Sequence, residues 1–131
     1  MTVVAYVDAS ALVKLVVPEA ESHEMLRWYV EVDRVITSRI GVVETRRAAA
    51  RFRHDAEGLR ALLASVEVFE LDARVEDRAV AVAPTLLRSL DAIHLASALE
   101  LGPTLDAFVT YDDRLATAAR EAGLPVIRPA A

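Results

Sequence analysis

Short apolar runs alternate along the chain with longer stretches in which apolar residues recur at helical spacing. The short runs are rich in Val, Ile, Phe and Tyr, and they predict strands at residues 3–7, 34–37, 66–71, 107–111 and 126–127. The longer stretches predict helices at residues 10–17, 19–32, 38–53, 57–65, 72–82, 91–101 and 112–122. Strands separated by helices pair in parallel, so the pattern predicts an α/β fold, a three-layer α/β/α sandwich around a mainly parallel sheet.

Several residues mark where these helices should begin and end. Pro18 should stop the first helix, because proline lacks the backbone N–H that a helix interior needs. Ser38 and Asp72 are candidate N-caps of the helices that follow them. Gly102, followed directly by proline, and Gly123 are typical of helix C-terminal ends.

Acidic residues stand at the ends of two predicted strands. Asp8 follows the first strand directly and Asp112 follows the fourth, and ligands of open parallel sheets gather at the carboxyl ends of strands. Asp8, Asp91 and Asp112 could each simply cap a helix. Glu44 lies inside an apolar stretch where capping does not explain it, and its ordinary interpretation is a solvated side chain or a pair with Arg47.

We hypothesise that the four carboxylates of Asp8, Glu44, Asp91 and Asp112 converge in one cleft. Carboxylates that crowd together raise one another's pKa, and a divalent cation relieves that repulsion. Ligands that are all oxygen favour a hard ion, Mg²⁺ or Mn²⁺. One such ion, or two about 4 Å apart, can activate a water and neutralise a phosphodiester transition state.

Composition narrows the alternatives. The length of 131 residues suits a single domain covering residues 1–131. The chain has no cysteine, which excludes thiolate zinc sites, iron–sulfur clusters and disulfides and is compatible with the cytoplasm. It has no nucleophile elbow and no phosphate-binding glycine loop. No apolar run is long enough to span a membrane, and a net charge of −5 argues against a protein that coats nucleic acid non-specifically.

Three motifs in order carry a resemblance to a known family. They are YVDASALVKL at residues 6–15, LDAIHLASA at residues 90–98 and FVTYDDRL at residues 108–115. With Glu44 on the helix after the second strand, the chain resembles PIN-domain ribonucleases, and among them the VapC-type toxins of bacterial toxin–antitoxin pairs. The resemblance covers nearly the whole chain.

The resemblance implies a set of site residues and partners. The family's four acids match Asp8, Glu44, Asp91 and Asp112. Ser10 and Thr110 match hydroxyl residues that support the site, while Asp113 could share the metal or cap a helix. Asp8, Asp91 and Asp112 are the expected metal ligands, with Glu44 as a possible fourth. The implied activity is endonucleolytic cleavage of RNA with Mg²⁺ or Mn²⁺, by a homodimer whose cognate antitoxin blocks the site.

Arginines gather around the predicted long helix. Residues 34–60 hold seven arginines against three acids, a local charge of +4. At helical spacing Glu44, Arg47 and Arg51 share one face, and the guanidinium fork suits phosphate oxygens. We predict that Arg47 or Arg51 contacts RNA phosphate, although a solvated helix face is the ordinary interpretation.

Three other features have ordinary interpretations that we favour. His94 lies one helical turn from Asp91, yet a hydrogen-bonding or packing histidine is expected more often than a base. Lys14 is expected to be solvated. The apolar residues of the second helix should belong to the core, with a dimer or antitoxin groove as the alternative; they are Met25, Leu26, Trp28, Tyr29 and Val32.

Three rival functions stay open to different degrees. A haloacid-dehalogenase-type phosphatase needs an acid two residues after Asp8, where Ser10 stands. A receiver-like phosphoacceptor domain needs an acid pair after the first strand and a lysine on a late strand, but Ala9 follows Asp8 and Lys14 is the only lysine. A catalytically silent PIN-fold binding module gains no support, because all four acids are present.

Overall fold

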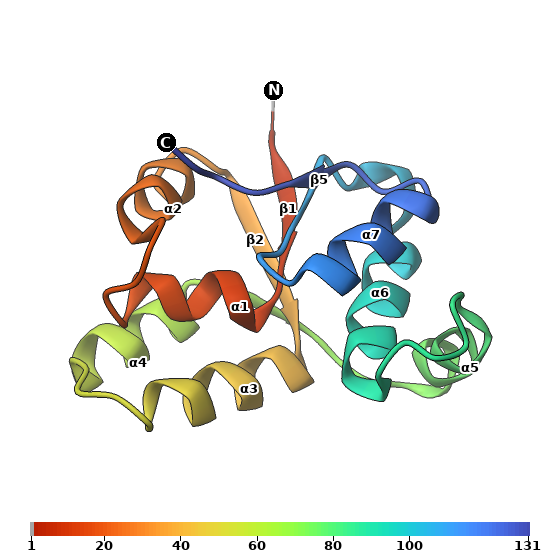
Figure 1. Cartoon of the computed structure of the whole chain (residues 1–131), viewed down its shortest axis with the longest axis horizontal. Helices are drawn as coiled ribbons and strands as arrows, with labels where there is room; N and C mark the ends of the chain where they lie inside the picture. The colour runs from red at the N-terminus through yellow and green to blue at the C-terminus, as the bar shows by residue number, and fades with distance from the viewer. Residues whose placement is uncertain (1) are drawn as a thin grey trace.

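Five parallel strands form one sheet in the order β3-β2-β1-β4-β5 (Figure 1). A computed structural model describes residues 2–131. The strands are β1 (Val4–Val7), β2 (Arg34–Ser38), β3 (Glu67–Phe69), β4 (Ala107–Val109) and β5 (Val126–Ile127). This confirms the predicted strands and the parallel pairing. The order differs from the 2-1-3-4-5 order of receiver-type domains, which removes that rival.

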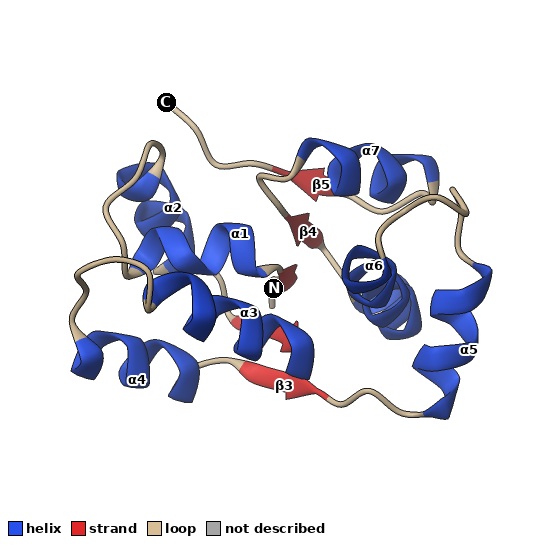
Figure 2. Ribbon diagram, turned by 60° about the horizontal axis from the view of Figure 1, so that its bottom comes forward, coloured by secondary structure: helices blue, strands red, loops and turns tan. Residues whose placement is uncertain are grey.

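Helices cover both faces of the sheet, as expected for three layers. Figure 2 shows α1 to α4 on one side of the column of strands and α5 to α7 on the other. They are α1 (Ala9–Leu12), α2 (Ser22–Tyr29), α3 (Arg39–Ala49), α4 (Ala56–Ala64), α5 (Ala73–Ala81), α6 (Ser89–Leu101) and α7 (Asp113–Glu121), with short 3₁₀ helices η1 (Val13–Leu15) and η2 (Gly102–Thr104). Within residues 2–131, none of these helices combines the length and apolarity that crossing a membrane requires.

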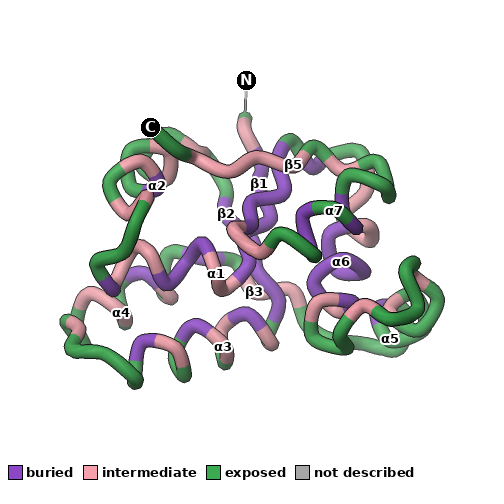
Figure 3. The backbone as a smooth tube through the Cα atoms, in the orientation of Figure 1, coloured by how far each residue is buried: buried purple, intermediate pink, exposed green. Residues whose placement is uncertain are grey.

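The strand period of two divides the core between the two faces. Along β1, Tyr6 packs with Leu95 and Phe108 on one face, while Val7 packs with Leu12 on the other. Figure 3 shows the central strands and most of α6 as buried, and α5 with its following loop as largely exposed. The central strands therefore hold their carboxyl ends in a rigid frame.

The apolar residues of α2 mostly join this core. Met25 is fully buried, and Trp28, Tyr29 and Val32 pack partly against the cluster that contains Leu12. Leu26 alone of the predicted set is exposed. The core interpretation is therefore confirmed for all of them except Leu26.

Helix boundaries differ from the prediction in four places. The first predicted helix is α-helical only to Leu12 and continues as η1, and α2 is shorter than predicted at both ends. Glu21 adopts a left-handed conformation (φ 65°) before α2, which interrupts the predicted helix. The long helix ends at Ala49 rather than Arg53, so Arg51 lies in the turn beyond it. Helix α6 begins at Ser89, so Asp91 lies in its first turn and does not cap it.

Candidate active site

The sheet order reverses between β1 and β4, and the carboxyl ends of these two strands meet there. Val7 of β1 pairs with Val109 of β4, and the Asp8 N–H donates to the Val109 carbonyl at 3.1 Å. Asp8 and Thr110, each the first residue beyond its strand, therefore lie next to each other. This is the crevice where an open parallel sheet binds its ligands.

Asp8 is held by hydrogen bonds to both of its carboxylate oxygens. Thr110 Oγ1 donates to Oδ2 at 2.5 Å, while Ser10 Oγ and the Ala11 N–H donate to Oδ1 at 2.7 and 3.1 Å. The residue is only 4% exposed. Burial raises the pKa of Asp8, whereas the charge of His94 and these hydrogen bonds lower it. Asp8 thus caps α1, as its ordinary interpretation predicts, and is fixed in orientation.

The same two hydroxyls also order the segment after β4. Ser10 Oγ accepts from the Tyr111 N–H at 2.8 Å, and Thr110 Oγ1 accepts from the Asp112 N–H at 3.0 Å. Each hydroxyl therefore donates its one proton to Asp8 and accepts a hydrogen bond from the neighbouring backbone. This geometry matches the supporting role expected of Ser10 and Thr110.

Asp112 and Asp113 are adjacent but point to different neighbours. Asp112 caps α7, with Oδ1 accepting from the Leu115 N–H at 2.9 Å. The Asp113 side chain is 89% exposed, and its Oδ1 lies 2.8 Å from an Arg128 nitrogen. Asp112 is thus the acid tied to the Thr110 cluster, and Asp113 belongs to a surface ion pair.

The charges of all three other acids affect the pKa of Asp91. Partial burial raises the pKa of Asp91, and repulsion from Asp112 raises it further. Attraction to His94 lowers that pKa, while weaker repulsion from Glu44 and Asp8 raises it. The four acids therefore share one electrostatic region, although they come from β1, α3, α6 and the end of β4.

The four acids are nevertheless not packed as a ready coordination shell. Within residues 2–131, no three acidic or histidine side chains stand close enough together to hold one metal ion. Three of the acids are engaged by other groups: Asp8 by two hydroxyls and the N-terminus of α1, Asp112 by the N-terminus of α7, and Glu44 by His94. The convergence of the four acids in one cleft therefore stays a prediction, supported by the charge interactions at Asp91 and not by a shared set of contacts.

Glu44 pairs with His94 rather than with Arg47. Its Oε1 lies 2.6 Å from Nε2 of His94, whose Nδ1 lies 2.6 Å from the hydroxyl of Tyr6. His94 is 2% exposed and Tyr6 is fully buried. Burial lowers the pKa of His94, but the hydrogen bond to Glu44 and the charges of the nearby acids outweigh it and raise that pKa overall. His94 is confirmed as a hydrogen-bonded histidine, whereas no sequence signal pointed to the role of Tyr6.

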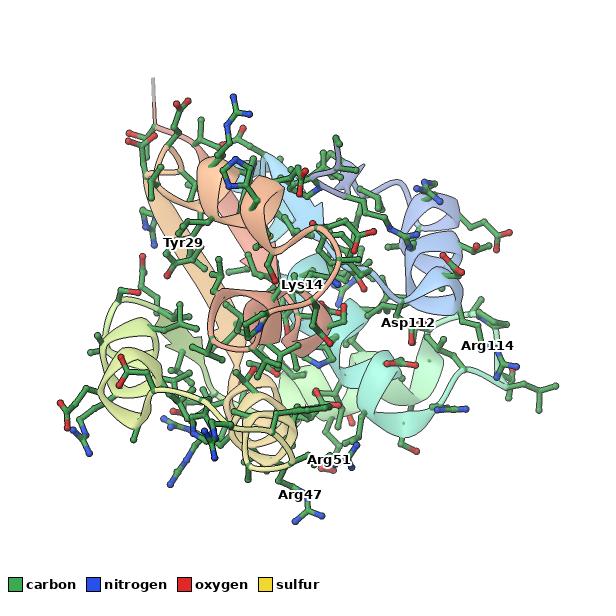
Figure 4. The ribbon with its side chains drawn as sticks, turned by 60° about the vertical axis from the view of Figure 1, so that its left-hand side comes forward. Lys14, Tyr29, Arg47, Arg51, Asp112 and Arg114 are labelled. Carbon is green, nitrogen blue, oxygen red and sulfur yellow. The ribbon has the colours of Figure 1, made fainter. Side chains whose placement is uncertain are left out.

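A groove of about 440 Å³ runs beside Glu44, between α1, α3 and the start of α6. Ser10, Glu44, Arg47 and Arg51 line it together with Leu90, over further apolar side chains. The two arginines thus open onto the groove that contains Glu44, as their spacing predicted, although Arg51 is contributed by the turn after α3. Both lie below Asp112 in Figure 4.

Lys14 corrects the expectation of a solvated side chain, because only 11% of that side chain is exposed. Its amine lies 3.0 Å from a Glu21 carboxylate oxygen, donates to the Ala20 carbonyl at 2.9 Å and stands 4.6 Å from the centre of the Tyr111 ring. The turn before α2 folds back over Lys14, and sequence spacing does not show such a fold. The amine therefore joins that turn to the segment after β4.

Comparison with known proteins identifies the family of the chain. The sequence model of the PIN domain matches residues 5–121. Ribonuclease VapC47 of Mycobacterium tuberculosis (strain CDC 1551 / Oshkosh) is 39% identical over 132 residues, covering 96% of this chain and 97% of the relative.

Solved structures show the same fold at low identity. VapC20 of Mycobacterium tuberculosis, described as a toxin that cleaves the sarcin–ricin loop, superposes with a TM-score of 0.72 at 22% identity, over 95% of this chain and 99% of that one. A chain of VapBC-1 from nontypeable Haemophilus influenzae superposes with a TM-score of 0.68 at 15% identity, over 95% and 97% of the two chains. The chain therefore belongs to the PIN-domain family, in the group of VapC ribonucleases.

Proposed function

We propose that the chain is the toxin of a toxin–antitoxin pair and acts as an endoribonuclease, hydrolysing RNA phosphodiesters in the four-carboxylate cleft. The observation that carries this proposal is the hydrogen-bonded cluster of Asp8, Thr110 and Asp112 where the strand order reverses. Burial, and then repulsion from Asp112, raises the pKa of the nearby Asp91, which supports the same placement. Relatives across nearly the whole chain are named ribonucleases, which supports the same activity. Among open sheets, this crevice is the usual place for a ligand.

The donor set fits a hard divalent cation, Mg²⁺ or Mn²⁺, because every candidate ligand is a carboxylate oxygen and their repulsion favours a positive charge. We assign Asp8, Asp91 and Asp112 as the residues that would hold one or two such ions, with Glu44 contributing. Their side chains would have to draw together on binding, because no three such groups among residues 2–131 stand close enough to hold one ion here. Asp113 is left out because it is exposed and paired with Arg128. When bound, the cation would lower the pKa of a water molecule and offset negative charge on the phosphate.

The protein's own residues would orient this chemistry. Ser10 and Thr110 hold the Asp8 carboxylate from both sides, so its oxygens do not swing away. Arg47 and Arg51 would bind RNA phosphates along the groove, since a guanidinium fork can donate to two phosphate oxygens. RNA lying there would pass beside Glu44 and reach the other acids.

The proposed partners follow from the family rather than from the side chains of the site. We infer a cognate antitoxin that covers the groove, and the similar fold within VapBC-1 supports this partner. A homodimer is the expected assembly, and an RNA substrate implies a cytoplasmic protein without membrane contact. These partners rest on the family, whereas the cleft itself is described by the side chains above.

Cleavage of end-labelled RNA by the purified, antitoxin-free chain tests the proposal. Asp8→Asn should lower the cleavage rate at least ~100-fold, more than the removal of a group that only hydrogen-bonds to a metal ligand causes. Asp113→Asn is the matched control, because it removes an adjacent acid that is exposed and should leave the rate unchanged. Wild-type cleavage should require Mg²⁺ or Mn²⁺ and stop with a chelator.

Two outcomes would contradict the proposal. Equal loss of cleavage in Asp113→Asn and Asp8→Asn would mean that the assignment of the acids is wrong. Intact defined RNA, total RNA and tRNA in the presence of wild-type protein with Mn²⁺ bound would instead favour a catalytically silent binding module.

A further inference from the structure

A buried polar chain leads from the core to the site through three separate elements. Tyr6 lies on β1, His94 on α6 and Glu44 on α3. The Tyr6 hydroxyl is 2.6 Å from His94 Nδ1, and His94 Nε2 is 2.6 Å from Glu44 Oε1. The proposed function uses Glu44 but does not explain why the two residues behind it are polar.

Packing alone does not explain the polar atoms of Tyr6 and His94. Tyr6 stacks on Phe108 with ring centroids 5.4 Å apart, and a phenylalanine at position 6 could make the same stack. Burying a hydroxyl and an imidazole costs free energy unless each polar atom finds a partner. Here the partners form one series of hydrogen bonds, from Tyr6 through His94 to the Glu44 carboxylate. The buried polar atoms of Tyr6 and His94 are therefore linked to a residue of the proposed site.

Hydrogen-bond chemistry fixes the orientation of the imidazole. An ionised Glu44 can only accept, so Nε2 of His94 must carry the proton that it donates. Tyr6 occupies the other ring nitrogen, Nδ1, and thereby selects which edge of the ring faces Glu44. A histidine next to a functional carboxylate is commonly oriented in this way by a third group.

The close approach of α3 to His94 depends on Gly41. A Cβ atom added at Gly41 would lie 3.3 Å from Cε1 of His94 and 2.2 Å from Oγ1 of Thr37. Gly41 and Glu44 are three residues apart and share a helix face. The absence of a side chain at position 41 therefore allows this face of α3 to pack close enough for Glu44 to contact the His94 imidazole.

We propose that Tyr6 and His94 are positioning residues that hold the Glu44 carboxylate in one orientation at the groove during RNA cleavage. This inference rests on the proposed function. Neither residue touches substrate: His94 acts through Glu44, and Tyr6 acts through His94. Without them, the flexible Glu44 side chain would sample several rotamers, and a misplaced catalytic group reduces rate more than it reduces substrate binding.

Imidazole ¹⁵N NMR of the metal-free protein tests the Tyr6–His94–Glu44 hydrogen bonds without relying on activity. The wild type should show His94 protonated on Nε2, and Glu44→Gln should shift the Nε2 resonance. Tyr6→Phe, which keeps the ring and its stack, should shift Nδ1. A His94 spectrum that both substitutions leave unchanged would overturn the proposal.

RNA cleavage then tests the positioning role. His94→Leu should lower kcat roughly 10- to 100-fold with little change in KM. His94→Gln, which keeps an N–H donor, should recover part of the rate. A role in folding alone would produce neither this recovery nor a loss of kcat at nearly constant KM. His23→Leu is the matched control, because that histidine is exposed. This variant should cleave RNA at the wild-type rate.

If His94→Leu does not fold, Tyr6→Phe provides the second variant and should lower kcat without changing KM. Wild-type kcat in folded His94→Leu or Tyr6→Phe, beside an active wild type, would overturn the positioning role alone. An inactive wild type would overturn the proposed function itself, and this role with it.

Discussion

The two sides of the cleft hold their acids by different means. On the strand side, Asp8 and Asp112 accept hydrogen bonds from backbone N–H groups at helix N-termini. Asp8 also accepts from the hydroxyl of Ser10, in α1, and from that of Thr110, at the end of β4. On the helix side, Glu44 is held by His94, a side chain from another element, and within residues 2–131 no backbone group hydrogen-bonds to its carboxylate.

Because the acids are held by different means, different substitutions should displace them on the two sides. Strand-side positions follow from the sheet, because paired strands of fixed register set where Asp8 and Thr110 stand. Helix-side positions depend on how closely α3 and α6 pack, so a small shift between two helices would move Glu44. We therefore expect the strand side to respond to the removal of hydroxyls, and the helix side to respond to added volume.

The largest effect is expected from Thr110→Val, which keeps the shape and removes a hydroxyl that bonds both Asp8 and Asp112. Cleavage should fall by roughly 100-fold, the upper range for a group that orients a metal ligand. Thr117→Val is the matched control, because Thr117 lies on the exposed face of α7. Equal rates for the two variants would show that the Thr110 hydroxyl does not orient the strand side.

Gly41→Ala should disturb the placement of Glu44 and His94 solely through the volume of the added methyl group. The added methyl group would collide with the Thr37 hydroxyl and press on His94, so the Thr37 side chain or α3 must shift. We expect cleavage to fall about tenfold and stability to fall by about 1–3 kcal/mol, as for overpacked sites. Gly58→Ala in α4, far from His94 in the sequence, should leave the cleavage rate unchanged; wild-type activity in Gly41→Ala would contradict the close approach.

A smaller effect is expected where RNA enters the helix side. Replacing Arg47 and Arg51 together by alanine should weaken RNA binding several-fold and reduce the slope of log affinity against log salt by roughly 0.7 for each phosphate that is no longer neutralised. Arg46 and Arg60, which line a separate groove between α3 and α4, provide the matched double variant. Equal salt slopes in all three proteins would refute the assignment of the groove.

The smallest effect concerns stability and pH. Burial and repulsion raise the pKa of Asp91, so its ionised form destabilises the fold at pH values above that pKa. Asp91→Asn should therefore melt at a higher temperature than the wild type at pH 8. The difference should shrink as the pH falls through the raised pKa, because the wild-type carboxyl then becomes neutral as well. A lower melting temperature at pH 8 would contradict the sign of this repulsion.

The strand side could be predicted from sequence because its signals are local. Asp8 directly follows a short apolar run and precedes a helix, which indicates both a strand end and a cap. Asp112 repeats that pattern after β4. Alternation of strands and helices likewise sufficed to predict the layered sheet, since burial of parallel strands dictates apolar runs.

The helix side could not be predicted to the same depth. Glu44 and His94 are 50 residues apart and His94 and Tyr6 are 88 apart, so only the folded chain reveals their contacts. Periodicity also did not locate the true helix ends, and it extended α3 past Ala49 to include Arg51. Helix ends depend on backbone turns and packing that a repeat of apolar residues does not encode.

Calorimetric titration of the metal-free protein with Mn²⁺ asks whether acids from both sides of the cleft form one site. Asp91 is the informative position, because it lies on α6 and yet senses Asp8 and Asp112 across the cleft. We predict that Asp91→Asn weakens Mn²⁺ binding at least ~10-fold relative to the wild type, as much as or more than the removal of a group that only orients a metal ligand. Unchanged Mn²⁺ affinity in Asp91→Asn would contradict a shared site and separate the helix side from the strand side.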